Sequence, residues 1–161
     1  MSKTLVAYFS VGGTTKEVAK RLAEAEGADI YEIVPAEPYT AEDLNWQDSK
    51  SRTTVEMEDL TCRPAMAGES LDLTGYETIF LGFPLWWNRE PSIVDTFLEA
   101  HDFDGKTIVP FCTSGGGGIG FTGDRIRQIA GGNCTVTVGQ RLGGTTSVAD
   151  LKTWADGLDI R

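Results

Sequence analysis

Short apolar runs along this chain alternate with stretches in which apolar residues recur every three or four positions. The runs at residues 4–9, 29–34, 78–84, 107–112 and 135–138 predict strands. The first, third and fourth runs are almost continuously apolar, which is typical of central strands that helices cover on both faces. The pattern therefore predicts a buried sheet rather than a sheet with one face in water.

Helical periodicity occupies four of the intervening stretches, at residues 16–26, 91–100, 125–130 and 147–158. Gly27 is suited to end the first helix, and Ser147 is suited to cap the start of the last one. Strands that alternate with helices in this way predict a parallel sheet with helices on both faces. We therefore expect an α/β fold, a three-layer α/β/α sandwich.

One long segment, residues 35–75, breaks this alternation and is rich in proline, Glu and Asp. Within it, Thr40 and Asp43 have the spacing of a helix cap, so a short helix is expected there. The acidic residues at 56–59 lack the spacing of metal ligands and predict a solvent-exposed face. No repeat and no second domain are visible, so we predict one domain over residues 1–161.

The charge balance is acidic, with 14 Lys and Arg against 24 Asp and Glu, which gives a net charge of −10. This balance argues against nucleic acid or an anionic membrane as a partner, and it favours docking to basic surfaces. The three cysteines, Cys62, Cys112 and Cys134, show neither a disulfide framework nor zinc spacing, which fits a reducing, cytoplasmic compartment. The apolar run at the N-terminus is too short for a signal or membrane segment.

The first candidate binding site is the loop after the first predicted strand. Five small residues there are candidate ligand contacts: Ser10, Gly12, Gly13, Thr14 and Thr15. A strand, a loop of hydroxyls and glycines, and a helix N-terminus together make an anion site, because free backbone N–H groups and the positive end of the helix dipole converge there. The loop therefore predicts a phosphate site.

Two further loops follow the third and fourth predicted strands. The second loop is aromatic: Pro84, Leu85, Trp86, Trp87 and Asn88. The third is rich in glycine and presents mainly backbone groups to a ligand: Thr113, Ser114, Gly115, Gly116 and Gly117. Ligands of open parallel sheets bind beyond the carboxyl ends of the strands, so the three loops are expected to meet. A phosphate, a flat ring that stacks on indole and polar ring edges that accept N–H bonds are all present in FMN.

The same residues carry a resemblance to a known family. Tyr8-Phe9-Ser10-x-x-Gly13-x-Thr15, Pro84-x-Trp86-Trp87 and Thr113-Ser114-Gly115-Gly116 are similar to the phosphate loop and the two ring loops of flavodoxin-like FMN-binding proteins. The resemblance spans nearly the whole chain and implies a five-stranded parallel sheet of order 2-1-3-4-5. It also implies that the hydroxyls of Ser10, Thr14 and Thr15, with the amides of Gly12 and Gly13, bind the phosphate.

Two positions in the phosphate loop depart from the commonest pattern of that family. Gly12 stands where Thr or Ser is usual, and Thr14 stands where Asn is usual. Gly12 removes a hydroxyl but lets the backbone approach a ligand closely, whereas Thr14 keeps a hydroxyl. FMN binding is expected to survive both changes.

The resemblance implies a low-potential electron carrier between redox partners with basic surfaces, without catalytic residues or a metal. An FMN-dependent NAD(P)H or quinone oxidoreductase of the same fold is the alternative, and a non-redox phosphate-binding module is a third hypothesis. Either redox role is compatible with a monomer or a weak homodimer. The chain contains neither a Gly-x-x-x-x-Gly-Lys-Ser/Thr run nor a Gly-x-Ser-x-Gly run, which argues against a P-loop NTPase and an α/β-hydrolase.

Overall fold

The computed structural model describes residues 3–45, 47–67, 71–86, 89–113, 122–137 and 139–158. Its strands are β1 (Lys3–Tyr8), β2 (Asp29–Glu32), β3 (Tyr76–Pro84), β4 (Thr107–Thr113), β5 (Thr135–Val136) and β6 (Gln140–Arg141). Its helices are α1 (Thr14–Glu26), α2 (Arg52–Glu58), α3 (Ser92–Glu99), α4 (Thr122–Ala130) and α5 (Val148–Asp156). Strands and helices alternate as the hydrophobic pattern predicts, except within the 35–75 segment.

The strands form one parallel sheet in the order β2-β1-β3-β4-β5, which confirms the predicted topology. The fifth position is divided between two short strands. β5 pairs with the first half of β4, at Thr107 and Ile108, whereas β6 pairs with its second half, at Phe111 and Cys112. The expected single strand at 135–138 is therefore shorter than predicted, and its neighbour β6 was not predicted.

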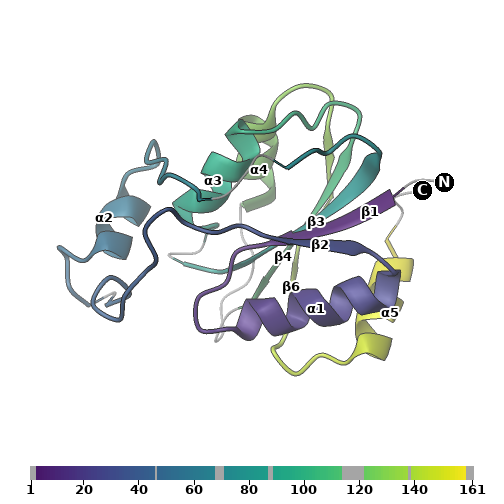
Figure 1. The fold of residues 1–161 in the computed structure, drawn as a ribbon, viewed down its shortest axis with the longest axis horizontal. Coiled ribbons are helices and arrows are strands. Elements are labelled where there is room, and N and C mark those ends of the chain that lie inside the picture. The colour runs from purple at the N-terminus through teal and green to yellow at the C-terminus, as the bar shows by residue number, and fades with distance from the viewer. Residues whose placement is uncertain are drawn as a thin grey trace.

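Helices cover both faces of the sheet and give the expected three layers (Figure 1). Successive residues of β1 alternate between the two faces, as the strand repeat requires. Leu5 and Ala7 belong to the core that contains Phe97 of α3, whereas Val6 and Tyr8 belong to the core shared with α1 and α5. This burial on both faces explains why the sequences of the central strands are almost unbroken apolar runs.

One glycine in the sheet makes room for a neighbouring ring. Gly82 of β3 lies opposite Phe111 of β4. A Cβ at Gly82 would come within 2.2 Å of the Phe111 ring, closer than any real contact. The absence of a side chain on β3 therefore allows the Phe111 ring to fill the core on that face.

The helix ends agree with the sequence signals. Gly27 ends α1 in the left-handed conformation with φ 59°, and the Ser147 hydroxyl accepts a hydrogen bond from the Asp150 N–H at 3.1 Å. The starts of α1 and α4 lie two and three residues before the predicted positions, at Thr14 and Thr122. Differences of this size arise because periodicity marks the buried face of a helix and not its first turn.

The 35–75 segment extends beyond the carboxyl end of the strands and carries α2 (Figure 1). Thr40 and Asp43 exchange the expected cap bonds, the Thr40 N–H to Asp43 Oδ2 at 3.0 Å and the Asp43 N–H to Thr40 Oγ1 at 3.2 Å. They close a turn at residues 41–44 and not a helix.

The helix of this segment begins later, at Arg52, with the Ser51 hydroxyl as its cap. The prediction of a solvent-exposed acidic face at 56–59 is wrong for Glu56, which is only 8% exposed. Its carboxylate has partners that lie outside the acidic run, so its burial could not be inferred from charge spacing.

The Gly82–Phe111 contact generates a stability prediction. Gly82→Ala should lower the free energy of unfolding by about 1–3 kcal/mol, because the added methyl group overpacks a closed core. Gly123→Ala is the matched control, since its Cβ would meet only the Thr137 carbonyl, at 3.8 Å, in a helix that favours alanine. Urea denaturation of the three proteins measures both effects, and equal stabilities would contradict the role assigned to Gly82.

Candidate functional site

The loop after β1 turns the chain into α1 with two consecutive glycines in the left-handed region. Gly12 has φ 84° and Gly13 has φ 95°. A Cβ at either position would meet nothing within 4 Å, so backbone conformation and not crowding requires glycine here. The turn makes Gly13 the N-cap of α1, and its carbonyl accepts the first helical bond from the Glu17 N–H at 3.0 Å.

The amino end of α1 faces this loop without a side-chain cap. Gly13 offers no side-chain acceptor to the amides of the first turn, and those amides have no acceptor inside the helix. They carry the partial positive charge of the helix dipole. The geometry is suited to an anion, and the phosphate contacts of Thr14 and of the two glycine amides stay predictions.

The hydroxyl of Ser10 is enclosed just before the two glycines. Its oxygen is buried and has no hydrogen-bond partner within the described part of the chain. Leaving a buried polar group unpaired costs roughly 1–3 kcal/mol. A ligand atom that accepts a hydrogen bond from Ser10 would remove this cost.

A shallow pocket of about 490 Å³ adjoins the amino end of α1. Its lining comes from the first loop, from α1 and from the segment before α5: Gly12, Gly13, Thr14, Glu17, Arg21, Gly144 and Thr145. Arg21 Nη1 donates to the Gly144 carbonyl at 2.7 Å and holds that segment against α1. The segment before α5 was not predicted as part of the site, although its Gly-Gly-Thr-Thr sequence at 143–146 is the same as that of residues 12–15.

A buried hydrogen bond joins the start of α1 to the end of β4. The hydroxyls of Thr15 and Thr113 lie 2.8 Å apart, although the two residues are 98 positions apart in the sequence. Both were predicted site residues, and the structure brings them together. One hydroxyl hydrogen forms this bond, and the hydrogen of the accepting hydroxyl stays available for a second partner.

Backbone hydrogen bonds fix the start of the second loop beside the end of β4. Pro84 pairs with Thr113 at the ends of β3 and β4, and the Leu85 N–H donates to the Thr113 carbonyl at 2.9 Å. Trp86 and Arg89 then exchange two backbone bonds, of 3.1 and 3.0 Å, which pair the two residues as an antiparallel bridge, the Trp86–Arg89 hairpin. The remaining predicted residues of these loops lie outside the described residues: Trp87, Asn88, Ser114, Gly115, Gly116 and Gly117.

The indole of Trp86 is held by two other aromatic rings. Phe9 meets it edge-to-face with ring centroids 5.6 Å apart, and Tyr39 does so at 5.5 Å. Such edge-to-face contacts add to the apolar contact area and fix the ring orientation. Trp86 therefore turns toward the core and the 35–75 segment.

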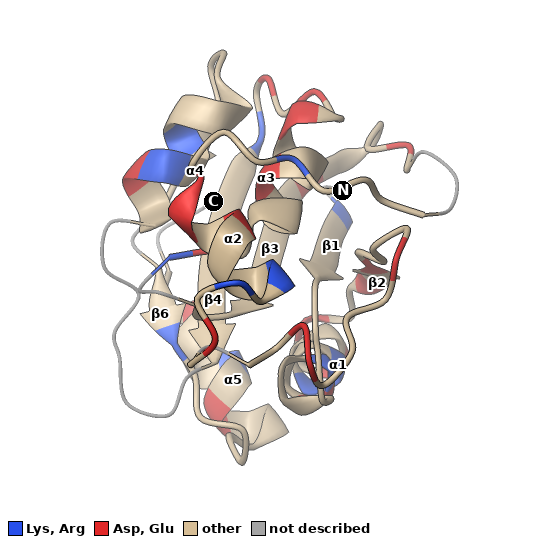
Figure 2. Cartoon of the chain, turned by 90° about the vertical axis from the view of Figure 1, so that its left-hand side faces the viewer, with Lys and Arg blue, Asp and Glu red and all other residues tan. Residues whose placement is uncertain are grey.

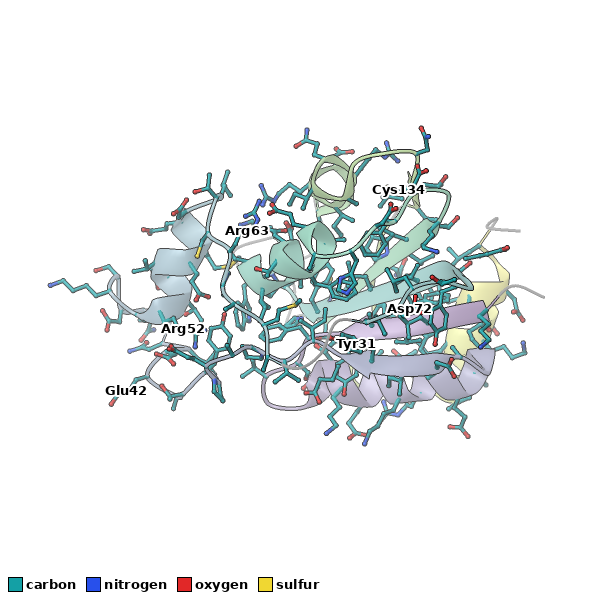
Figure 3. All side chains as sticks on the ribbon, turned by 45° about the horizontal axis from the view of Figure 1, so that its top comes forward. Tyr31, Glu42, Arg52, Arg63, Asp72 and Cys134 are labelled. Atoms are coloured by element: carbon teal, nitrogen blue, oxygen red, sulfur yellow. The ribbon has the colours of Figure 1, made fainter. Side chains whose placement is uncertain are left out.

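Tyr39 is itself fixed by a charged pair from α2. Its hydroxyl donates to Glu56 Oε1 at 2.6 Å, and the Arg52 guanidinium lies 3.9 Å above its ring. Arg52 Nε in turn donates to Glu56 Oε2 at 2.9 Å, and Figure 3 shows Arg52 on this outlying part of the molecule. Burial, followed by the hydrogen bond to Glu56, raises the pKa of Tyr39, so the phenol stays protonated.

The predicted site was not expected to include Tyr39 or α2. An Arg four residues before a Glu, at 52 and 56, was the one local signal for this cluster. The contact between Tyr39 and Trp86 joins segments 47 residues apart, and a single sequence contains no signal for it.

The described residues contain no group of three or more His, Cys, Asp or Glu side chains that could hold a metal ion. None of the helices that the structure describes is long and apolar enough to cross a membrane.

Comparison with solved structures gives several similar folds. A candidate flavoprotein from Bacteroides uniformis is 46% identical, with a TM-score of 0.89 over 96% of this chain and 98% of that one. A second, from Bacteroides eggerthii, is 40% identical, with a TM-score of 0.90 over the whole of both chains. A flavoprotein from Lactobacillus acidophilus, solved in complex with FMN, is 19% identical, with a TM-score of 0.71 over 96% of this chain and 99% of that one.

A search of the curated proteins gave no match to this chain. The sequence model of one family, described as flavodoxin, matches residues 3–158. That match covers the sheet, all three loops and the 35–75 segment. This chain therefore belongs to the flavodoxin family.

Proposed function

We propose that this chain binds FMN at the carboxyl end of the sheet and carries electrons at low potential between redox partners. The observation that supports the proposal most is the first loop. There a buried Ser10 hydroxyl without a partner among the described residues lies beside Gly12 and Gly13, at an uncapped helix end. A phosphate satisfies all three features at once.

The residues that would hold the phosphate follow from this arrangement. The Ser10 hydroxyl and the amides of the first turn of α1 donate to its oxygens, and Thr14 adds a hydroxyl at the same end. The Thr15–Thr113 pair has one hydroxyl hydrogen left to donate. The Lactobacillus acidophilus flavoprotein, which has a similar fold, was solved in complex with FMN, and this supports the choice of ligand.

The second and third loops would contact the ring. Bound FMN supplies reversible transfer of one or two electrons. The indole of Trp86 is already oriented by Phe9 and Tyr39. Stacking by Trp86 or Trp87 and amide bonds from residues 114–117 are the contacts we propose for the ring and its polar edge.

Charge supports a carrier with protein partners. The net charge is −10, and Figure 2, which faces the end that carries α2, shows Asp and Glu interspersed with Lys and Arg. An overall negative charge disfavours the anionic reduced flavin, which lowers its potential, and it attracts basic partner surfaces. The free thiols of Cys62, Cys112 and Cys134 support a reducing, cytoplasmic setting.

A second candidate is an FMN-dependent NAD(P)H or quinone oxidoreductase. The observation in its favour is the 35–75 segment, which adds a wall beside the ring loops through the contact between Tyr39 and Trp86. An enzyme needs such a wall to enclose a second substrate, whereas a carrier needs an open ring edge.

FMN binding is tested with two serine variants that should behave in opposite ways. Ser10→Ala removes a hydrogen bond to a charged group, worth about 1.5–3 kcal/mol, so the Kd for FMN should rise about ten- to a hundredfold. The stability of the apo-protein should not fall, because the lost hydroxyl has no partner among the described residues. Fluorescence titration with FMN measures the affinity.

Ser147→Ala is the matched control. It removes the cap of α5 and should lower the free energy of unfolding by about 1 kcal/mol without changing the Kd. An unchanged Kd for Ser10→Ala, or no FMN binding by the wild-type protein, would contradict the proposal.

The carrier and the oxidoreductase differ in steady-state kinetics. With FMN bound, the isolated protein should oxidise NADPH only slowly in the presence of a quinone. Once reduced by a partner reductase, it should transfer electrons to a small basic haem protein. That rate should fall steeply between about 10 and 150 mM salt, because the Debye length falls from about 30 to 8 Å. Rapid NADPH oxidation would favour the second candidate.

A further inference from the structure

Two carboxyl groups lie fully buried next to the Trp86–Arg89 hairpin. Glu90 follows the hairpin directly, and Asp95 lies in the first turn of α3. Both residues are 0% exposed. Carboxylates are almost never buried to this extent unless partners satisfy them, so the contacts of each oxygen decide their charge state.

One guanidinium holds both groups. Arg125 of α4 donates from Nε to Glu90 Oε1 at 2.7 Å and from Nη2 to Asp95 Oδ2 at 2.9 Å. Because neighbouring nitrogens of one guanidinium bind the two carboxyl groups, the groups are drawn together. Arg125 thus bridges the end of the hairpin and α3.

Two more guanidiniums face the same oxygen of Asp95. Arg89 Nη1 lies 3.5 Å from Oδ2, and Arg63 Nη1 lies 3.8 Å from it. Arg63, which Figure 3 labels, also donates from Nε to Glu99 of α3 at 2.6 Å. The positive charges of Arg63 and Arg89 also help to lower the pKa of Asp59, and they partly offset the rise in the pKa of Cys62 that burial causes.

The other two oxygens of the pair form no hydrogen bond within the described residues. Glu90 Oε2 and Asp95 Oδ1 are buried and have no partner among the residues that the structure describes. The Glu90 side chain lies within hydrogen-bond reach of the Asp95 carboxyl group. Two ionised carboxylates cannot bond to each other, because neither has a donor. One proton between them satisfies both oxygens.

We infer that the Asp95 carboxyl group holds a proton that it donates to Glu90, and that this proton stabilises the packing of the Trp86–Arg89 hairpin against α3 and α4. The pair acts on the hairpin through Arg89, which donates to the Met57 carbonyl at 3.1 Å and to Ser92 Oγ at 3.1 Å while it pairs with Asp95. The proton site thus lies where the hairpin, the end of α2, α3 and α4 meet.

The pH dependence follows from burial. Desolvation, followed by the charge of Glu90, raises the pKa of Asp95 to about 8, although Arg125 and Arg89 oppose the shift. Since the folded-state pKa lies above the ordinary value of 3.8, the stability that the proton contributes is complete below about pH 4. It is lost as the pH rises through about 8.

The test uses the apo-protein, so it does not depend on FMN. Between about pH 5 and pH 8 the folded wild-type chain holds one more proton than the unfolded chain at this site. The ratio of the folding constants of wild type and Asp95→Asn should therefore fall about tenfold per pH unit. The amide introduced by this substitution can donate to Glu90, so the variant keeps the bond without the titrating proton. Urea denaturation at several pH values gives the ratio.

Glu99→Gln is the matched control, because it neutralises a partly exposed carboxylate on the same helix that pairs with the same Arg63. Its ratio to wild type should not change with pH. Parallel curves for wild type and Asp95→Asn would mean that both carboxylates are ionised, and would overturn the inference.

Infrared spectroscopy of the wild-type protein decides the question if Asp95→Asn does not fold. The carbonyl band of a protonated carboxylic acid should be present at pH 6, should shift when Asp and Glu are labelled with ¹³C, and should disappear by pH 9. Absence of the band at pH 6 would also overturn the inference.

A consequence for the cofactor rests on the proposed function. Because the hairpin carries Trp86, loss of the proton should weaken FMN binding several-fold between pH 7 and pH 9 in wild type but not in Asp95→Asn. A flat FMN affinity, with the apo-protein slope intact, would overturn the link to the cofactor alone.

Discussion

The backbone hydrogen bonds that pair β3 with β4 continue without a shift from Thr78 to Pro84. This pairing ends both strands at the same height, so that the Leu85 amide reaches the Thr113 carbonyl. β1 pairs with the other side of β3, and the Phe9 amide bonds to Gly82. The strand pairing therefore brings the carboxyl ends of β1, β3 and β4 together, and the missing side chain of Gly82 allows the Phe111 ring to fill the core on one face of the sheet.

The 35–75 segment is attached to the rest of the molecule at several points, through apolar residues in the core and through bonds to α3, and two of its contacts meet at Trp86 and Arg89. Tyr39 packs on Trp86 at one point, and Arg89 donates to the last carbonyls of α2 at another. Both contacts end at the Trp86–Arg89 hairpin. The segment and the ring loop are therefore expected to respond together to a change in either one.

Much of the fold could be read from the sequence, because buried parallel strands and amphipathic helices leave periodic patterns. The caps at Gly27 and Ser147 could be predicted for the same local reason. The strand β6 could not, since its two residues are exposed and pair only with the end of β4. Within the site, the composition of two different loops predicted Thr15 and Thr113 as site residues. The hydrogen bond between them could not be predicted, because it depends on how the folded chain places the two residues. The burial of Glu90 and Asp95 likewise depends on Arg125, which lies 30 or more positions away in the sequence. The buried Glu56 bonds to Arg52 and Tyr39, neither of which was a predicted site residue.

The bond between Thr15 and Thr113 has a consequence for how the site meets its ligand. A flexible loop loses conformational freedom when it is ordered by binding, and this loss reduces affinity. Here the start of α1 and the end of β4 are already joined by a buried bond in the folded chain. The positions of Thr15 and Thr113 are therefore set during folding, and a ligand that contacts these two hydroxyls would not have to order them.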